Sequence, residues 1–173
     1  MGYQERGPLP RRRFLRLRER GVRRGKRPVD SDECGFAPSV TRRYGYARKG
    51  QRVYGLTSGK RRPRTSLLAA RIDDHLQAPC LFEGSCDAVV FTGWLKTMRC
   101  PRLSGDHVVI MDNAAVHKSP AAIQLIEKTG ATLLFLPPYS PELNPIENDF
   151  AALKKNREYH QMLPIDDIIN AYK

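Results

Sequence analysis

The apolar residues of this 173-residue chain gather most tightly in two short runs of its C-terminal half. The runs 108–111 and 133–136 each hold four large apolar side chains, bounded by polar or turn-forming residues. Runs of this length are typical of strands that are buried on both faces of a sheet. Asp112 directly follows the first run, so we expect it at the carboxyl end of a buried strand, where open α/β sheets bind their ligands.

Helical spacing of apolar residues marks further segments of the chain. Asp87 is a predicted N-cap for one helix, and Ser119 followed by proline predicts the start of another, which Gly130 ends. Alternation of polar and apolar residues predicts a hairpin from 52–56 and 65–72. The remaining expected elements are a short strand at 79–82 and helices over 87–98, 147–156 and 165–172.

This order of strands and helices predicts an α/β domain with a mixed sheet flanked by helices. The length fits a single domain, which we place at residues 28–173. Segment 28–33 holds one valine among polar residues, so hydropathy does not predict it as a core strand. Residues 1–27 are rich in arginine and are flanked by glycine and proline, which favours a poorly ordered basic arm.

The net charge of +12 is concentrated in two blocks. Residues 1–27 carry eleven basic residues against Glu5 and Glu19, and residues 42–64 carry nine with no acid. Each block therefore has a net charge of +9, which leaves −6 for the rest of the chain. Positive charge concentrated beside an acidic body predicts a polyanionic partner, above all nucleic acid, although a solvated basic tail also fits residues 1–27.

Cysteine and hydropathy patterns narrow the expected environment of the protein. Cys34, Cys80, Cys86 and Cys100 form no Cys-x-x-Cys pair, so we expect free thiols in a reducing compartment. No apolar stretch approaches the roughly 18 residues of a membrane span, and no signal-peptide core follows the start. The sequence thus predicts a cytoplasmic protein that does not bind membranes.

Three acidic residues, Asp32, Asp112 and Glu147, are the candidates for metal chemistry. Divalent cations such as Mg²⁺ prefer carboxylate oxygens, and a pair of ions can promote phosphoryl transfer. Taken singly, Asp112 also fits a cap after a strand, and Glu147 fits a favourable charge in the first turn of a helix. The proline-rich loop 137–145 immediately before Glu147 favours the metal hypothesis, because a rigid segment there fixes the position of that carboxylate.

The segments Asp-Asn-Ala-Ala-Val-His at 112–117 and Leu-Pro-Pro-Tyr-Ser-Pro-Glu-Leu-Asn-Pro-Ile-Glu at 136–147 resemble the hallmark motifs of transposases with an Asp-Asp-Glu triad. The likeness is to bacterial insertion-sequence enzymes of the mariner-like superfamily, and it covers residues 28–157. Thirty-four residues lie between Asp112 and Glu147, as is typical of that group. The segment from Asp32 to Phe36 resembles the one that carries the first aspartate.

The resemblance implies a ribonuclease H-like fold with Asp32, Asp112 and Glu147 as catalytic residues that bind two Mg²⁺ or Mn²⁺ ions. It implies supporting roles for Asn113, His117 and Asn144, with a helix-entry hydrogen bond as the alternative for His117. Glu33 is the rival to Asp32, because adjacent residues of a strand point to opposite faces. Basic residues of the second block are the candidates for binding DNA phosphates: Arg42, Arg43, Lys49, Arg52, Lys60, Arg61, Arg62 and Arg64.

The activity that the resemblance implies is metal-dependent DNA strand cleavage, followed by strand transfer of the 3′-hydroxyl to target DNA. Relatives carry a helix-turn-helix region ahead of the catalytic domain, so the chain is interpreted as N-terminally truncated, with a homodimer or a partner polypeptide supplying that region. Two alternatives remain at this point. One is a catalytically inactive DNA-binding remnant, and the other is a structure-selective nuclease that does not need element ends.

Overall fold

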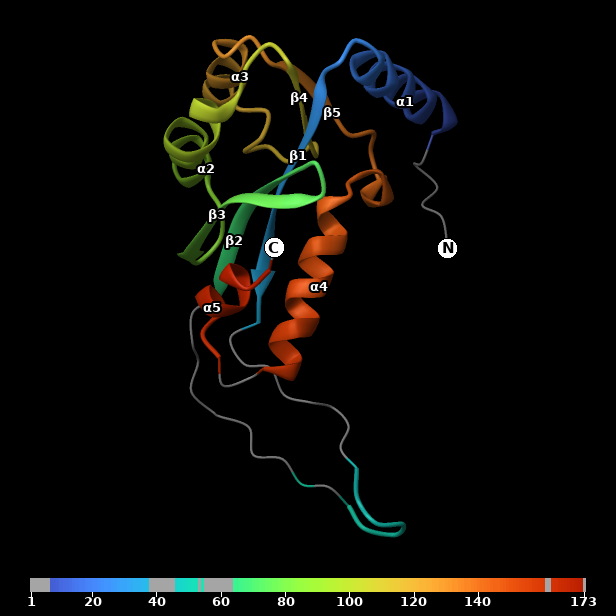
Figure 1. The fold of residues 1–173 in the computed structure, drawn as a ribbon, viewed down its shortest axis with the longest axis vertical. Helices are drawn as coiled ribbons and strands as arrows, with labels where there is room; N and C mark the ends of the chain where they lie inside the picture. Colours follow the sequence, from blue (N-terminus) through green and yellow to red (C-terminus); the bar gives the residue numbers. More distant parts are fainter. Residues whose placement is uncertain (1–6, 38–45, 53, 55–63, 161–162, 173) are drawn as a thin grey trace.

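The computed structural model describes residues 7–37, 46–52, 54, 64–160 and 163–172. Within these ranges, five strands form one mixed sheet in the order β3-β2-β1-β4-β5. Strands β1, β4 and β5 run parallel, while β2 is antiparallel to both β1 and β3 (Figure 1). The predicted mixed sheet is therefore confirmed. The strands span Arg27–Phe36 (β1), Thr65–Ile72 (β2), His75–Glu83 (β3), His107–Met111 (β4) and Thr132–Phe135 (β5).

The predicted helix starts are also confirmed. The side chain of Asp87 accepts a hydrogen bond from the Val90 amide at 2.8 Å, and that of Ser119 accepts one from the Ala122 amide at 3.4 Å. No helix of the described ranges is long and apolar enough to cross a membrane. The α-helices are Pro8–Arg23 (α1), Ala88–Trp94 (α2), Pro120–Glu127 (α3), Ile146–Tyr159 (α4) and Ile165–Asn170 (α5), with shorter helical turns at Leu95–Arg99, Cys100–Arg102 and Pro141–Leu143.

Strand β1 lies at the centre of the sheet, although hydropathy did not predict it as a core strand. It pairs with β2 on one side and with β4 on the other, and its residues 29–32 are all buried. Hydrogen bonds to two neighbouring strands satisfy its backbone, so a polar segment can occupy the core position. The expectation from hydropathy was wrong because it counted side chains and left out these two ladders.

The predicted hairpin between 52–56 and 65–72 is also wrong. Both edges of β2 are already occupied, by β1 and by β3, which leaves no edge for another strand. Arg52 and Tyr54 are not in a strand, and residues 53 and 55–56 lie outside the described part. The turn that leads from β2 to β3 is instead Asp73-Asp74, where φ is 47° and 65°. Two left-handed residues in succession are typical of a tight hairpin turn, and Asp tolerates them better than most residues.

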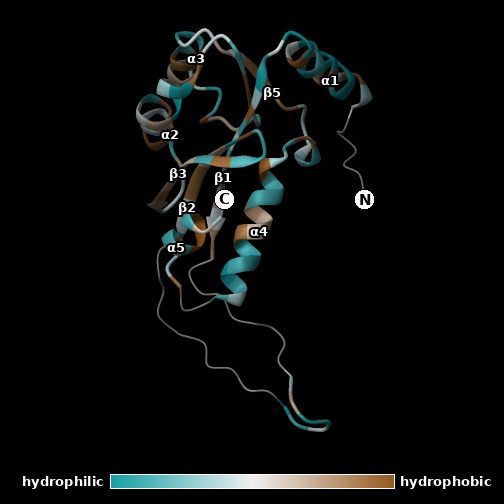
Figure 2. Ribbon diagram, viewed as in Figure 1, coloured by the Kyte–Doolittle hydropathy of each residue, from teal (hydrophilic) through white to brown (hydrophobic). Residues whose placement is uncertain are grey.

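Helices cover both faces of the sheet (Figure 2). On one face, α2 and α3 pack over alternate residues of the strands, among them Val29 and Val109. On the other face, α4 and α5 pack over Cys34, Phe36 and neighbouring strand residues. Strands that are buried from both sides read as continuous apolar runs, which explains why β4 was recognisable in the sequence; β5 lies at the edge of the sheet, where its residues 133–135 are only half-buried.

Helix α1 corrects the expectation of a poorly ordered arm at residues 1–27. Residues 8–23 form a 16-residue helix, and its Phe14 is buried against Val108, Ile110 and Leu136. A Cβ atom on Gly21 would lie 2.9 Å from Val108 Cγ2, so this glycine allows the helix to approach β4 closely. The high arginine content of this segment favoured the prediction of disorder, because only one narrow face of the helix is apolar.

We predict that Phe14→Ala lowers the free energy of unfolding by roughly 3–4 kcal/mol, because it leaves a cavity between α1 and β4. The matched control is Leu15→Ala, whose side chain is 37% exposed and whose loss should cost less than about 1 kcal/mol. Urea denaturation followed by far-UV circular dichroism measures both. Equal losses in the two variants would contradict the packing of α1 on the sheet.

Candidate active site

The register of β1 and β4 brings Asp32 and Asp112 to the same level of the sheet. Val29 is paired with Val109 and Asp30 with Ile110, so two residues further along these parallel strands come Asp32 and Asp112. Both lie just beyond the last pair of the β1–β4 ladder: Asp112 follows the end of β4, whereas Asp32 lies inside β1, which continues to Phe36. The predicted location of Asp112 at the end of a buried strand is confirmed, because Met111 is the last residue of β4.

Glu147 reaches the same region from α4, through a chain of tight turns. The amide of Leu143 donates to the Ser140 carbonyl at 3.1 Å, and that of Asn144 to the Pro141 carbonyl at 2.9 Å. The amide of Glu147 then donates to the Asn144 carbonyl at 3.2 Å, so the loop continues directly into the first turn of α4. These successive turns fix where the helix starts, as the proline-rich sequence predicted.

The three carboxylates line one cavity of about 260 Å³. Its wall also contains the loop from Leu136 to Pro141, which crosses from β5 toward α4. Five of the six predicted catalytic and supporting residues therefore lie together, and the sixth, His117, contacts one of them. The five are Asp32, Asp112, Asn113, Asn144 and Glu147.

Asp32 is the most buried of the three acids, with 7% of its surface exposed. Asn144 Nδ2 donates to its Oδ2 at 2.7 Å, and the Glu33 amide donates to its Oδ1 at the same distance. Burial raises the pKa of Asp32 to about 7; the Glu33 amide opposes this rise, and the charges of Asp112 and Glu147 add to it. The rival Glu33 is exposed on the opposite face, where burial and a hydrogen bond with Glu33 raise the pKa of Cys86 to about 12.

The buried His117 orients Asp112 through a hydrogen bond. Its Nδ1 lies 2.5 Å from Asp112 Oδ1, and the imidazole ring is buried against Phe91 with a centroid distance of 4.4 Å. Because a carboxylate only accepts, Nδ1 carries the proton of this hydrogen bond. The bond with His117 holds the pKa of Asp112 below its usual value. Asn113, beside Asp112, is anchored through a hydrogen bond from Nδ2 to the Leu136 carbonyl.

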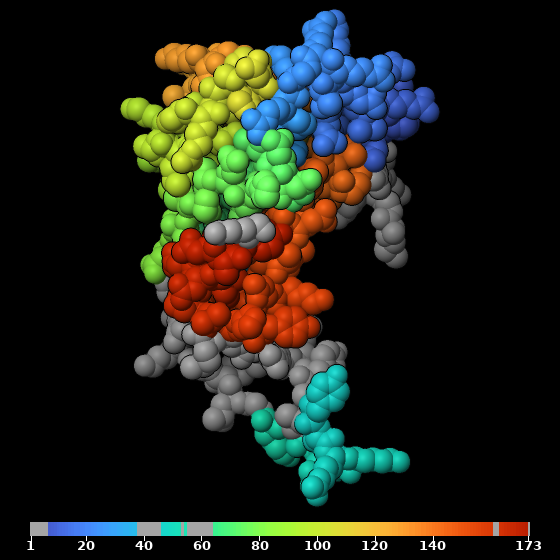
Figure 3. Space-filling view, viewed as in Figure 1, coloured from blue at the N-terminus to red at the C-terminus, as the bar shows by residue number. Residues whose placement is uncertain are grey.

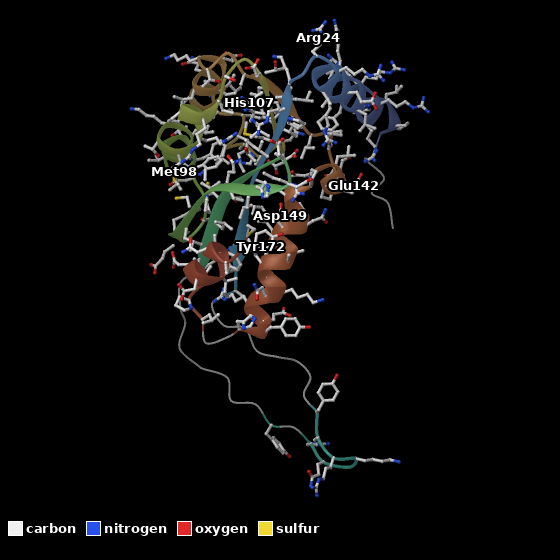
Figure 4. All side chains as sticks on the ribbon, viewed as in Figure 1. Arg24, Met98, His107, Glu142, Asp149 and Tyr172 are labelled. Atoms are coloured by element: carbon white, nitrogen blue, oxygen red, sulfur yellow. The ribbon has the colours of Figure 1, made fainter. Side chains whose placement is uncertain are left out.

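A buried ion pair that the sequence did not reveal ties α4 to the sheet. Arg71 Nη1 on β2 donates to both carboxylate oxygens of Asp149, at 2.7 and 2.6 Å. The hydroxyl of Tyr172 donates to Asp149 Oδ1 at 2.7 Å (Figure 4). Asp149 follows Glu147 by two residues, so this cluster holds the first turn of α4 against β2. No local pattern marked Asp149, because its partners are more than twenty residues away in the sequence.

The predicted DNA-binding residues are only partly covered by the described ranges. Lys49 and Arg52 lie in an exposed segment that stands apart from the sheet, and Arg64 lies across Gly35 of β1, where a Cβ atom would be 1.9 Å from Arg64 Nε (Figure 1). The predicted position of this block on a hairpin near the site is therefore not observed. The other five of these predicted residues lie outside the described part: Arg42, Arg43, Lys60, Arg61 and Arg62.

The cavity has the chemistry of a divalent-cation site. Its donors are carboxylate oxygens, which hard cations prefer, and the buried Oδ1 of Asn144 has no hydrogen-bond partner in the described structure. A bound cation would offset the repulsion that contributes to the raised pKa of Asp32. Among the described residues, no three acidic, histidine or cysteine side chains are already close enough to hold one ion, so side-chain rotation would have to complete the site.

Comparison with known proteins gives a family match and a structural match. Residues 29–169 match a family model described as DDE superfamily endonuclease. The fold is similar to that in the Mos1 strand transfer complex, with a TM-score of 0.70 and 18% identity over 100% of this chain and 56% of that one. It is also similar to the Mos1 mariner paired end complex with Mn, with a TM-score of 0.64 and 20% identity over 90% of this chain and 51% of that one.

A bacterial relative matches over a shorter range. The uncharacterized protein y4pE/y4sA of Sinorhizobium fredii (strain NBRC 101917 / NGR234) is 45% identical over 49 residues, which are 28% of this chain and 34% of that protein. The chain spans about half the length of the Mos1 chains that it matches. At these identities the solved structures show a shared fold alone.

We predict that Asp32→Asn stabilises the protein at pH 8 in the absence of divalent cations. A carboxyl whose folded-state pKa is raised from 3.8 to about 7 stabilises the fold fully below pH 3.8, and this contribution is lost as the pH rises through 7. Asparagine stays neutral, so the two proteins should be equally stable near pH 4 and differ by up to about 4 kcal/mol at pH 8.

Urea denaturation in EDTA at pH 4, 6 and 8 measures this difference. The control is Asp106→Asn, which replaces an exposed aspartate outside the cavity. A stability difference between wild type and Asp32→Asn that does not grow with pH would contradict the buried, charge-crowded position of Asp32.

Proposed function

This chain belongs to the DDE superfamily endonucleases, and we propose that it is a transposase catalytic domain that cuts DNA with divalent metal ions and carries out strand transfer. The family is that of DDE transposase catalytic domains, and the mixed sheet has the ribonuclease H-like order. The observation that carries the proposal is the meeting of three distant carboxylates in one cavity. Asp32, Asp112 and Glu147 come from β1, the end of β4 and α4, and all of them line it.

In the proposed reaction, the three carboxylates bind two Mg²⁺ or Mn²⁺ ions. When bound, such ions activate the attacking oxygen and stabilise the leaving oxygen in phosphoryl transfer. The solved Mos1 complex with Mn supports this choice of metal for the present chain. The side chains that line the cavity would supply acceptor oxygens to these ions.

The supporting residues fix the orientation of these carboxylates. Asn144 donates to one oxygen of Asp32, and its own backbone carbonyl receives the amide of Glu147, so one residue links two of the acids. His117 holds Asp112 through Nδ1 and is itself held by Phe91. Asp32 and Asp112 are thus held in place, and rotation of the exposed Glu147 side chain would complete the site. Asn144 and His117 therefore act as positioning residues in the proposed reaction.

Two phosphoryl transfers make up the proposed activity. In the first, water attacks a phosphodiester, the bond from phosphorus to the 3′-oxygen breaks, and this oxygen leaves as a 3′-hydroxyl once it takes up a proton. In the second, this hydroxyl attacks a phosphodiester of the target strand, forms a new bond to phosphorus and releases the other target end as a hydroxyl. The first step consumes water and leaves a 5′-phosphate on the other fragment, and the second exchanges one phosphodiester for another, so neither step needs an oxidant or an energy-rich co-reactant.

The proposed partners are the DNA ends of the mobile element and target DNA. The relatives that support this are Mos1 paired end and strand transfer complexes, of which this chain spans about half. A separate polypeptide with a helix-turn-helix would recognise the element ends, and a second copy of the chain would complete a homodimer. The basic block at 42–64 would contact phosphates, as the sequence predicts.

We predict that Asp112→Asn abolishes metal-dependent nicking of supercoiled plasmid, because the substitution removes a charged ligand from the cavity. Agarose gels with 5 mM Mn²⁺ or Mg²⁺ measure the conversion to open circles, and we expect a loss of at least a hundredfold. Asp106→Asn serves as the control and should nick like the wild type. Unchanged nicking by Asp112→Asn, or a wild type that binds DNA and never cuts it, would overturn the proposal and favour the inactive remnant.

We also predict that Mn²⁺ raises the melting temperature of the wild type. At ten times the dissociation constant, binding to the folded state alone stabilises by about 1.4 kcal/mol, which corresponds to roughly 2–5 °C for a domain of this size. Glu147→Gln should lose most of this shift, while Glu127→Gln, on the exposed end of α3, should keep it. Equal shifts in all three proteins would place the bound cation outside the cavity.

A further inference from the structure

Helix α1 presents a continuous basic surface beside the cavity. Its nitrogen-tipped side chains extend away from the sheet, and the helix forms a corner of the molecule in the space-filling view (Figures 3 and 4). The single acid of its described residues, Glu19, lies 3.7 Å from Arg23 and neutralises only part of this charge. The exposed arginines of the helix and its C-cap are Arg12, Arg13, Arg16, Arg20, Arg23 and Arg24.

The surface is held rigidly, which distinguishes it from a solvated basic tail. Phe14 and Gly21 fix the inner face of the helix against β4. Arginines on the outer face therefore project from a fixed backbone, and fewer degrees of freedom are lost when they bind a ligand. Their guanidinium groups match the geometry of phosphate oxygens.

The helix is also tied to the wall of the cavity. Arg11 Nη1 donates to Ser140 Oγ at 3.0 Å and forms an ion pair with Glu142. Ser140 lines the cavity, and Glu142 lies in the short helical turn that leads to α4. Figure 4 shows Glu142 beneath α1, with Arg24 near the opposite end of the helix. A ligand bound along α1 would therefore lie at a fixed distance from the carboxylates.

The basic surface continues from the helix onto the sheet edge. A hollow of about 310 Å³ between α1 and β5 is lined by Arg20, Arg24 and Lys26, among other residues. Lys26 Nζ donates to Thr132 Oγ1 at 2.8 Å, so this side chain joins α1 to β5. The basic side chains thus extend from α1 to the rim of a hollow whose other lining residues are mostly apolar.

We propose that the outer face of α1 is a phosphate-binding surface that holds a DNA duplex against the cavity. This inference rests on the proposed function and adds the surface that positions the substrate. A helix of 16 residues is about 24 Å long, which corresponds to roughly seven phosphate spacings along one strand. The arginines would contact phosphates of the DNA backbone and not the bases, so the binding is independent of sequence and sensitive to salt.

The test compares two triple variants of the full chain. One variant removes three charges from the outer face of α1: Arg12→Gln, Arg16→Gln and Arg20→Gln. The control removes three charges from exposed positions on the α2–α3 side: Lys96→Gln, Arg102→Gln and Lys128→Gln. Both variants lower the net charge equally, and glutamine keeps the helix propensity of arginine. Fluorescence anisotropy with a labelled 30-base-pair duplex, in EDTA and 50–200 mM KCl, measures the affinity.

We expect the α1 variant to bind at least tenfold more weakly at 100 mM KCl. The slope of log affinity against log salt should fall by about 0.9 for each lost phosphate contact, or by 2–3 in total. The control should change affinity less than twofold. A third variant, Arg12→Lys, Arg16→Lys and Arg20→Lys, should keep most of the slope because it keeps the charge, and it excludes unfolding as the cause.

Equal weakening by the two glutamine variants would overturn the inference, because diffuse net charge would then explain binding. An unchanged affinity of the α1 variant would also overturn it and leave α1 as a surface for a protein partner. These outcomes are independent of cleavage. A chain that never nicks but needs α1 to bind DNA refutes the proposed function alone, whereas one that nicks and binds equally well without these arginines refutes this inference alone.

Discussion

The parallel register of β1 and β4 is the constraint on which the site depends. Asp32 and Asp112 are eighty positions apart, and the pairing of Val29 with Val109 sets them side by side. A slip of one residue would turn Asp32 to the α2–α3 face and Val29 away from its core. Val29 is fully buried in that core, so the free energy of its burial resists such a slip. The position of Asp32, a proposed catalytic acid, thus depends on an apolar side chain three residues earlier.

This arrangement buries acidic side chains in the sheet and in α4, which packs on it. Arginines from other elements offset the cost of burying their negative charges. Burial raises the pKa of Asp30 to about 6, while the charges of Arg18 on α1 and Arg71 on β2 act against that rise. Arg71 also binds Asp149, which anchors the helix of Glu147. The basic residues therefore have two separate tasks. Arg18 and Arg71 stabilise buried acids, whereas the arginines of the outer face of α1 remain exposed on the surface.

The difference between what the sequence predicted and what it missed has a physical basis. Strand β4 was recognisable because every residue in it is buried, and the capped helices were recognisable because Asp87 and Ser119 act through neighbours three residues away. Strand β1 was missed by hydropathy, so no strand pattern placed the metal-ligand candidate Asp32 beside Asp112, and the family resemblance was needed to identify it as the first aspartate of the triad. The contacts of Phe14 and Arg71 are long-range, so no local pattern could indicate that α1 is a packed helix or that Asp149 is buried.

In the proposed function an acidic cavity accepts a polyanion, which poses an electrostatic problem, and the charge distribution of the chain offers a solution. Carboxylates repel phosphates over about 10 Å at 0.1 M salt, so the attraction that brings DNA to the cavity must come from cations close by. Bound metal ions can neutralise the carboxylates but cannot align a duplex. A rigid row of arginines on α1, linked by Arg11 to the loop that leads to Glu147, supplies both attraction and direction. The distribution of the net charge of +12 therefore matters more than its size, because the positive surface flanks the negative cavity.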